Sequence, residues 1–401
     1  MYDLILRDAT LVTSGGREVA DVAIKNGSIA YVGPRPPRRA KEEVSAIGKF
    51  LMPGVIDTGV LFDPDRGADA WEAESRAAVS GGVTSILCLP WGQRPIVDRE
   101  SARARMSLAR GRSWCHYGLW GAATAGNLDE IKATAEEGLT LATLACLGSR
   151  TDGLGVGPEH VKTLLNAPGT LGVQLCEVTL DGDSGAQSML DEMRRAAGRV
   201  HLVHLSTALE LDLLDPVRGN LPVTAGVTPH HLFLSQDDGH VATTFPPVRA
   251  EHDRKTLWAA MKRGRLDCVA SDHHPSIHAN GSTVGIPGTE LLFPLMLSAV
   301  KYGRLSLESL ASLCAEAPAR IFGLENKGRI AKGADADLIM FSEGELTRVS
   351  EDHLLSTADW SPYLNREAAP KPEMVMVAGE IVARRGEVVA DSPPGRPLTE
   401  S

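Results

Sequence analysis

Side chains able to bind a metal or transfer a proton stand at the ends of apolar runs. His204 closes the run in VHLVHLS, Asp57 follows the run in PGVID, and Asp272 follows the run in DCVAS. An acid in apolar surroundings is costly unless it is paired or coordinates a metal. Asp272 is therefore a candidate metal ligand or general base. His204 is a candidate ligand, although a histidine in such a position is more often tied to a neighbouring backbone group.

Further histidines and one cysteine give weaker signals. His230 and His231 follow a proline in TPHHLFLS. Neighbours on an extended segment point in opposite directions, so at most one of the pair would face a shared centre. His273 and His274 are also candidate ligands, but such residues more often line a loop. Cys176 stands at a strand end, where a buried structural thiol is commoner than a nucleophile.

A two-metal hydrolase needs more ligands than these. It needs several histidines, a bridging acid or a modified lysine, and an open position for hydroxide. No His-x-His pair occurs in the chain, and no lysine lies between Lys132 and Lys162. The pattern raises the question of a metal-dependent enzyme that has lost its metal.

The candidate residues share a position in the predicted fold. Between about residues 53 and 325, short apolar strands alternate with helical patterns, as where TSILCLP follows AWEAESRAAVSGG. Alternation over this length predicts a (β/α)8 TIM barrel of the α/β class. Chemistry in that fold takes place at the carboxyl ends of the strands. His204 and Asp272 stand at such ends.

The two ends of the chain are predicted to form a second unit. Residues 1–52 hold short alternating segments separated by turn signals such as KNGS, and similar material returns over 326–392. Neither part has enough apolar residues for its own core. We therefore expect one small β-sandwich, built from both chain ends, beside the barrel at 53–325. The polar, Pro-rich tail at 393–401 is predicted to be disordered.

Composition excludes several classes of partner. The chain has 401 residues, of which 43% are hydrophobic and 23% charged, as is ordinary for a globular protein. A net charge of -10 argues against nucleic acid or an anionic membrane as partner. Six scattered cysteines without a Cys-x-x-Cys pair predict reduced thiols. The N-terminus has no signal-peptide pattern, so we expect a cytoplasmic protein without a membrane span.

A series of motifs runs along nearly the whole chain. The motifs are PGVIDTG, AAVSGGVTSILCLP, TDGLGVG, VHLVHLSTA, VTPHHLFLS, FPPVRAEHDRKTLW, LDCVASDHHP, GIPGTELLFPLML and LENKGRIAKGADADLIMF. Their order and spacing resemble those of the dihydroorotases, which belong to the amidohydrolase superfamily. The resemblance is to the bacterial type whose bridging metal ligand is an Asp in a DDG motif. It implies the amidohydrolase form of the barrel with its accompanying β-sandwich.

This chain departs from the family pattern at the metal site and at the substrate site. The family start IDxHxHxR reads IDTGVLFD here, and the HxED strand end is also altered. The three metal-binding histidines of the family correspond here to Gly59, Leu61 and Leu175. The substrate-binding arginine, the asparagine of the MPNT loop and the last histidine of DHAPH correspond to Asp63, Trp91 and Ser276.

Three of the six metal ligands that the resemblance implies are retained, namely Asp152, His204 and Asp272. By the family layout each metal would keep only two of them, whereas catalytic zinc sites usually have three protein ligands. We therefore expect no bound metal. If the chain is active, zinc is the expected cofactor and Asp272 the catalytic residue.

The resemblance implies two main hypotheses for function. Inactive dihydroorotase homologues serve as structural subunits of aspartate carbamoyltransferase. The first hypothesis is therefore a non-catalytic structural or regulatory subunit in pyrimidine biosynthesis, with an aspartate carbamoyltransferase-like partner and a homo-oligomeric state. The alternative is a divergent enzyme that acts on a cyclic amide or ureido substrate with a rebuilt or metal-poor site. A third hypothesis, an active dihydroorotase or hydantoinase, would need His230, His231 or His273 as a replacement ligand.

Overall fold

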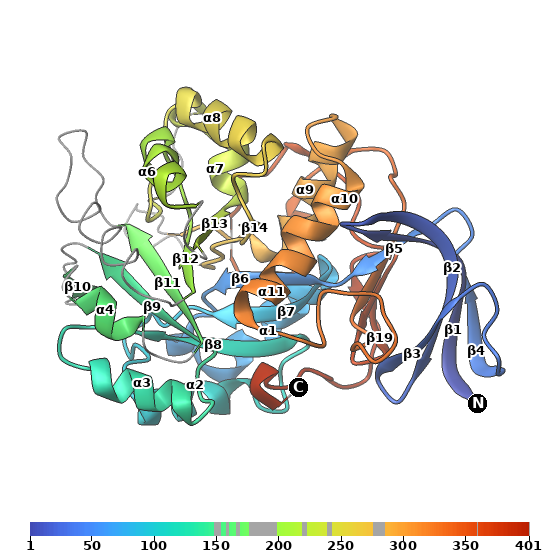
Figure 1. The fold of residues 1–401 in the computed structure, drawn as a ribbon. Coiled ribbons are helices and arrows are strands. Elements are labelled where there is room, and N and C mark those ends of the chain that lie inside the picture. The colour runs from blue at the N-terminus through green and yellow to red at the C-terminus, as the bar shows by residue number, and fades with distance from the viewer. Residues whose placement is uncertain are drawn as a thin grey trace.

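The central part of the chain folds as a barrel of parallel strands (Figure 1). The computed structural model describes residues 1–147, 154–157, 160–165, 169–175, 199–218, 223–238, 243–275, 285–358 and 360–400. The barrel strands are β6 Val55–Val60, β7 Val83–Cys88, β8 His116–Ala122, β9 Ala142–Leu147, β11 Thr170–Leu175, β12 Val200–Leu202, β13 Val223–Val227 and β14 Cys268–Val269. They pair in sequence order from β6 to β14, with the short β10 (Gly155–Val156) beside β9. The predicted α/β barrel is confirmed.

The barrel closes between its first and last strands. Val60 and His273 form a parallel bridge. The Leu61 N–H donates to the His273 carbonyl at 2.7 Å, and the His273 N–H donates to the Gly59 carbonyl at 3.1 Å. Closure therefore joins the end of β6 and Leu61 to the segment that follows β14, and it sets the positions of Gly59 and Leu61 relative to Asp272.

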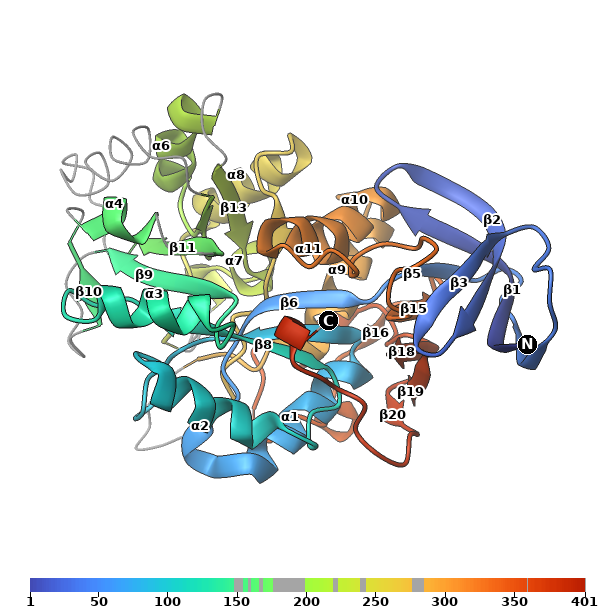
Figure 2. The same cartoon turned by 60° about the horizontal axis from the view of Figure 1, so that its bottom comes forward.

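Helices cover the outer face of the barrel (Figures 1 and 2). They are α1 Gly67–Ser80, α2 Arg99–Ala109, α3 Leu128–Glu136, α4 Val161–Leu164, α6 Ala208–Arg218, α7 Pro229–Phe233, α8 Glu251–Lys262, α9 Leu292–Lys301, α10 Leu307–Ala311 and α11 Ala317–Phe322. Helix α2 begins where the Asp98 carboxylate accepts the Ser101 N–H, as an N-cap residue does. Helix α1 buries Trp71 and Val79 against the strands. No helix in the described ranges is long and apolar enough to span a bilayer.

Both ends of the chain contribute strands to one separate sheet, as predicted. The strands are β1 Tyr2–Thr13, β2 Gly16–Lys25, β3 Ser28–Gly33, β4 Ala40–Ser45, β5 Phe50–Pro53, β15 Leu338–Phe341, β18 Met374–Val377, β19 Glu380–Arg384 and β20 Glu387–Val388. The two halves meet where β5 pairs antiparallel with β15, from Phe50 opposite Phe341 to Pro53 opposite Leu338. The Phe50 and Phe341 rings lie 5.6 Å apart at this seam. A smaller sheet pairs β16 Thr347–Arg348 with β17 Glu367–Ala368.

The prediction of a disordered tail at 393–401 is wrong for residues 393–400. The Gly395 N–H donates to the Ser113 carbonyl at 3.0 Å, and the Tyr117 N–H donates to the Arg396 carbonyl at 3.1 Å. Leu398 is only 4% exposed and enters an apolar cluster of the barrel. The polar composition suggested disorder, but backbone pairing beside β8 and one buried leucine hold the segment in place (Figure 2).

A buried charge network joins the barrel to the second sheet. Lys327 Nζ donates to Asp335 Oδ2 and to Asp337 Oδ2, each at 2.7 Å. On its other side the Asp337 carboxylate lies 3.2 Å from His116 Nε2. Burial alone would raise the pKa of Asp337, but His116 and Lys327 outweigh burial and hold this pKa well below its ordinary value. Asp337 is therefore ionised, and it depends on Lys327 as its counter-charge.

We predict that Lys327→Met destabilises the protein by about 3–5 kcal/mol at pH 7, because it leaves a buried carboxylate without its counter-charge. The lowered pKa means that Asp337 contributes stability above the unfolded-state value of about 4 and that this contribution is lost as pH falls below it. Urea unfolding at pH 7 and at lower pH measures both effects. The exposed Lys255, 3.6 Å from Glu251, is the control, and Lys255→Met should change stability by less than about 0.5 kcal/mol. Equal effects of the two substitutions would contradict the network's role.

Candidate functional site

A cavity of about 280 Å³ opens at the carboxyl ends of the barrel strands. The active sites of TIM barrels lie at this end of the strands. The lining residues come from strand ends and from the loops that follow them. They are Leu61, Trp91, Gln174, His204, Thr243, Thr244, Phe245, Asp272, His274 and Gly285.

The imidazole of His204 fills the space beside Gly59. A Cβ atom built on Gly59 would lie 2.8 Å from His204 Nε2, a contact shorter than real Cβ atoms show, and 3.3 Å from its Cε1. His204 is only 4% exposed. A side chain at position 59 would therefore require His204 to move. The resemblance implied a lost metal-binding histidine at position 59, and the structure adds that the His204 ring occupies the volume beside Gly59.

Leu61 packs as an apolar residue. It is 6% exposed and belongs to a cluster that includes Leu89 and Val203, with Trp91 packed against it. Its main chain is held by the strand closure described above. An apolar side chain thus stands where the resemblance implied a second metal-binding histidine.

Asp272 faces the cavity beside two histidines. Its Oδ1 lies 3.5 Å from His204 Nδ1, and its Oδ2 lies 4.0 Å from His230 Nε2. These distances are too long for good hydrogen bonds. Asp272 and His204 both have positive φ angles, of 50° and 54°. Such backbone strain in non-glycine residues concentrates at functional sites.

A second acid lies beneath Asp272. Asp57 is fully buried, and its Oδ1 accepts the Ser271 N–H at 2.9 Å, while its Oδ2 accepts no hydrogen bond from the described residues. Burial raises the pKa of Asp57. Burial, followed by the charge of Asp57, raises the pKa of Asp272 well above its ordinary value. Two carboxyl groups thus share a poorly solvated region.

Burial also keeps the neighbouring histidines uncharged. It lowers the pKa of His204 to about 3 and that of His231 to about 4. His231 is engaged on both ring nitrogens, with Nδ1 2.8 Å from Thr228 Oγ1 and Nε2 3.2 Å from the Pro247 carbonyl. It is therefore a structural residue. His230 keeps both ring nitrogens without hydrogen bonds to described residues.

His273 does not replace a missing ligand. Its Nδ1 accepts the Gly288 N–H at 3.1 Å, so its Nε2 carries the proton, and this nitrogen lies 3.2 Å from Glu74 Oε2. Glu74 is completely buried on helix α1. His273 therefore makes structural contacts within the barrel wall and does not line the cavity. Its neighbour His274 does line the cavity.

The described residues do not fit a two-metal centre. No group of three His, Cys, Asp or Glu side chains within them is arranged to hold a metal ion. Asp152, Cys176 and Ser276 lie outside the described residues, as does the side chain of Leu175. The position of Gly59 is filled by His204 and that of Leu61 by a packed apolar side chain. No catalytic step through a metal is derived from this arrangement.

Two of the positions where the resemblance implied substrate contacts, Asp63 and Trp91, have structural roles. The Asp63 carboxylate accepts the Asp65 N–H at 3.0 Å and caps the 3-10 turn Pro64–Arg66. Trp91 lines the cavity, and its carbonyl accepts a hydrogen bond from Arg105 Nη2 at 2.9 Å. Arg105 is only 3% exposed. It holds the loop after β7 through backbone carbonyls.

Some cavity residues gave no sequence signal. Gln174 precedes the altered strand end, and its Nε2 donates to the Phe245 carbonyl at 2.9 Å. Phe245 begins the motif FPPVRAEHDRKTLW, which gave no indication that its phenylalanine lines the cavity. Thr243, Thr244 and Gly285 reach the cavity through the same tertiary arrangement. These three residues can be identified as cavity residues only from the folded structure, in which separate loops come together.

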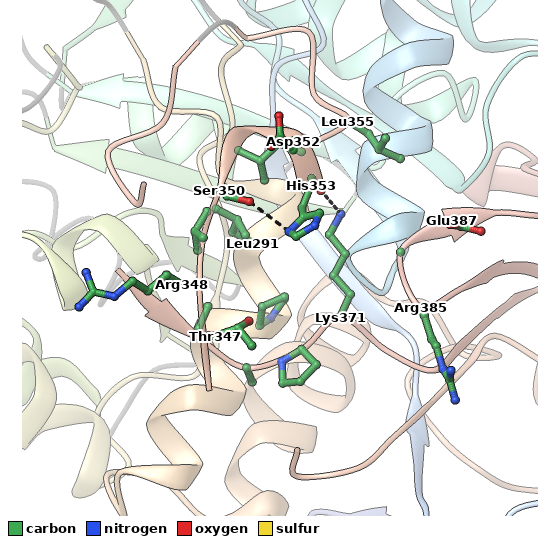
Figure 3. A pocket seen from close by; sticks show the side chains of 17 residues that line it. Leu291, Thr347, Arg348, Ser350, Asp352, His353, Leu355, Lys371, Arg385 and Glu387 are labelled. Carbon is green, nitrogen blue, oxygen red and sulfur yellow. Dashed lines mark hydrogen bonds between the residues drawn. The ribbon is translucent and has the colours of Figure 1, made fainter. Parts of the chain in front are cut away.

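A second hollow, of about 380 Å³, lies away from the barrel mouth (Figure 3). Lys371 crosses it and donates to Glu290 Oε1 at 2.5 Å and to the His353 carbonyl at 2.7 Å. Arg348 and Arg385 extend away from its centre on opposite sides (Figure 3). The Lys371 ammonium group inside this hollow is thus already engaged in structural contacts.

Comparisons with known proteins place these features in context. The sequence pattern of the Amidohydrolase family matches residues 58–383. The dihydroorotase of Methanosarcina acetivorans is 29% identical, over 99% of this chain and 95% of its own length. The allantoinase of Bacillus velezensis is 30% identical, over 90% of each chain. A solved L-hydantoinase from Arthrobacter aurescens superposes with a TM-score of 0.90 at 26% identity, covering 98% of this chain and 99% of that one.

We predict that Gly59→Ala destabilises the protein by about 1–3 kcal/mol, because its Cβ collides with the His204 ring in a packed site. The same substitution in a His204→Ala background should cost almost nothing, and a double-mutant cycle by urea unfolding measures this coupling. Gly126 has open space around its Cα, so Gly126→Ala is the matched control. Additive effects of the Gly59 and His204 substitutions would show that His204 does not occupy this volume.

Proposed function

Because the chain belongs to the amidohydrolase family, we propose that it is a non-catalytic, dihydroorotase-like member that acts in pyrimidine biosynthesis. The observation that carries the proposal is the His204 ring in the volume beside Gly59. Metal-dependent hydrolysis of a cyclic amide needs a metal-bound hydroxide held by several ligands. Of the positions where the resemblance implies metal-binding histidines, position 59 has its space filled by His204 and position 61 carries the buried Leu61.

The partner that we propose is an aspartate carbamoyltransferase-like protein, for which this chain would be a structural or regulatory subunit within a homo-oligomeric assembly. A dihydroorotase is among the relatives that match nearly the full length of this chain. The barrel core, the strand closure and the charge network around Lys327 are all well formed, although no group of three side chains in the described residues is arranged to hold a metal. A fold kept for its surface would have this combination of features.

The alternative is a divergent enzyme for a cyclic amide or ureido substrate. The observation that favours it is the cavity of about 280 Å³ that reaches Asp272 and His274. The raised pKa of Asp272 suits a proton donor near neutral pH. The names of two relatives, an allantoinase and an L-hydantoinase, give the substrates to be tried first.

We predict that protein purified without chelators holds well under one zinc ion per chain. We also predict that it hydrolyses neither dihydroorotate nor allantoin nor hydantoin, because no metal-bound hydroxide is formed. Elemental mass spectrometry and the three assays on one preparation measure this. Zinc retained through dialysis together with turnover would refute the non-catalytic proposal, and turnover without metal would favour the alternative enzyme.

A restored pair of histidines serves as a control for this result. Gly59→His with Leu61→His should remain inactive towards dihydroorotate, because Asp63, Trp91 and Leu175 are unchanged and His204 stands in the way. Measurable turnover by this double variant would contradict our account of the cavity.

We predict that the purified chain forms a stable complex with the aspartate carbamoyltransferase encoded in the same genome. Size-exclusion chromatography with light scattering, on each protein alone and on the mixture, measures the complex and the oligomeric state of each component. Bovine serum albumin in place of the transferase is the control for non-specific association. Separate elution at micromolar concentrations would rule out this partner.

A further inference from the structure

We propose that the loop between β3 and β4 is a docking site for an acidic segment of a partner protein. This loop, the arginine loop, spans residues 34–39 and reads PRPPRR. The inference rests on the proposed function, because a chain that acts through its surface needs a site that holds its partner. It goes further by naming that site and the chemistry of the segment that it binds.

The arginine loop concentrates positive charge on an acidic protein. Residues 34–45 carry four cations and two acids, although the net charge of the whole chain is -10. Arg35, Arg38 and Arg39 are all exposed. None of these three forms an ion pair or a side-chain hydrogen bond with a residue that the structure describes. Many other arginines do form ion pairs, among them Arg7, Arg17, Arg99, Arg103, Arg112, Arg254 and Arg366. The loop therefore presents three guanidinium groups to an outside anion.

Acids on the neighbouring strands are already engaged by other cations. The Glu43 carboxylate on β4 accepts two hydrogen bonds from Arg7, at 2.8 Å and 3.0 Å. Asp21 on β2 accepts a third from the same guanidinium at 2.7 Å. Asp3 Oδ1 on β1 lies 2.7 Å from Lys41 Nζ. These three carboxylates are therefore not available to neutralise the arginine loop.

Three prolines stiffen the arginine loop. Pro34, Pro36 and Pro37 fix the backbone φ angle at their positions and have no N–H group. The Arg39 carbonyl accepts the Tyr2 N–H at 2.9 Å, which ties the end of the loop to the start of β1. A loop of this kind loses little conformational freedom when a ligand binds, and pre-organisation of this sort improves affinity. The guanidinium groups are thus its main hydrogen-bond donors, and they project from a restrained backbone.

The position of the arginine loop leaves it accessible from outside. β3 is the last strand of its sheet and pairs with β2, whereas β4 pairs with β1. Figure 1 shows β3 and β4 at the end of the molecule opposite to helices α3, α4 and α6. An outside segment can therefore approach the loop without crossing the barrel.

The chemistry of the loop favours carboxylates on a short segment. The planar fork of arginine donates two parallel hydrogen bonds to a carboxylate, which makes such pairs stronger than those between neutral groups. A nucleic acid duplex or an anionic membrane also offers anions, but each is an extended surface. It would bring further negative charge against a chain with a net charge of -10. A short run of Asp or Glu contacts the loop alone, so an acidic protein segment is the favoured ligand.

Fluorescence anisotropy on the full chain tests the site, with labelled octaglutamate as the probe and a neutral Gly-Ser octapeptide as the reference. Octaglutamate should bind at least about tenfold more tightly than the neutral peptide at low salt. Combined substitution of Arg35→Gln, Arg38→Gln and Arg39→Gln should weaken octaglutamate binding by at least about fivefold, as expected for three exposed ion pairs of ordinary strength. Salt at about 0.3 M should weaken it as well, because exposed charges are then screened.

The matched control removes three positive charges from the barrel helices. It combines Arg103→Gln, Lys132→Gln and Lys255→Gln, whose side chains are 62%, 44% and 72% exposed. This variant has the same net charge as the loop variant and should keep its affinity for octaglutamate within about twofold. Circular dichroism shows that both variants are folded. Equal losses of affinity in the two variants, or no binding of octaglutamate, would overturn the docking site.

Two further outcomes separate this proposal from its alternatives. Loop-dependent binding of a DNA duplex of about 20 base pairs that is tighter than binding of octaglutamate would overturn the acidic protein segment as ligand. Loop-dependent octaglutamate binding without a transferase complex contradicts only the proposed transferase partner. A transferase complex that survives the loop substitutions, with no octaglutamate binding, contradicts only the docking site.

Discussion

The backbone contacts that close the barrel between β6 and β14 are the constraint on which the site depends. Leu61 and His273 share a hydrogen bond across this closure, and Gly59 accepts another from His273. Because the closure is made by main-chain groups, it places no demand on the side chains at 59 and 61. The barrel can therefore keep its shape with a glycine at position 59 and a leucine at position 61. Asp272, next to His273, is held in place by the same contacts.

Buried aspartates at the two ends of the barrel differ in their surroundings and in their pKa values. At the foot of the barrel, the buried Asp337 has a lysine and a histidine as partners, and its pKa is lowered. At the mouth, no lysine or arginine of the described residues forms an ion pair with Asp57 or Asp272, and burial raises the pKa of both acids. The same residue type is thus held as an anion at one end of the barrel and is favoured as the neutral acid at the other. Perturbed pKa values such as those at the mouth cluster at functional sites.

The sequence predicted the barrel, the shared sheet and the strand-end positions of His204 and Asp272, because each depends on local periodicity. It did not predict that His204 turns into the space at Gly59, since this depends on a positive φ angle and on packing between strands that are far apart in the chain. Phe245 was missed because only the tertiary arrangement brings its loop to the cavity. The tail was misjudged because one leucine, Leu398, outweighs its polar neighbours once a groove of the barrel covers it.

The pairing of β5 with β15 has a consequence for synthesis on the ribosome. Pro53 and Leu338 are partners in this sheet, so the N-terminal strands wait for about 285 further residues before their neighbour emerges. At about 5–20 residues per second this interval is roughly 15 to 60 s. Throughout that time β5 presents an unpaired edge of apolar residues, which is a template for aggregation. The nascent chain should therefore depend on a chaperone that shields this edge until translation has passed β15.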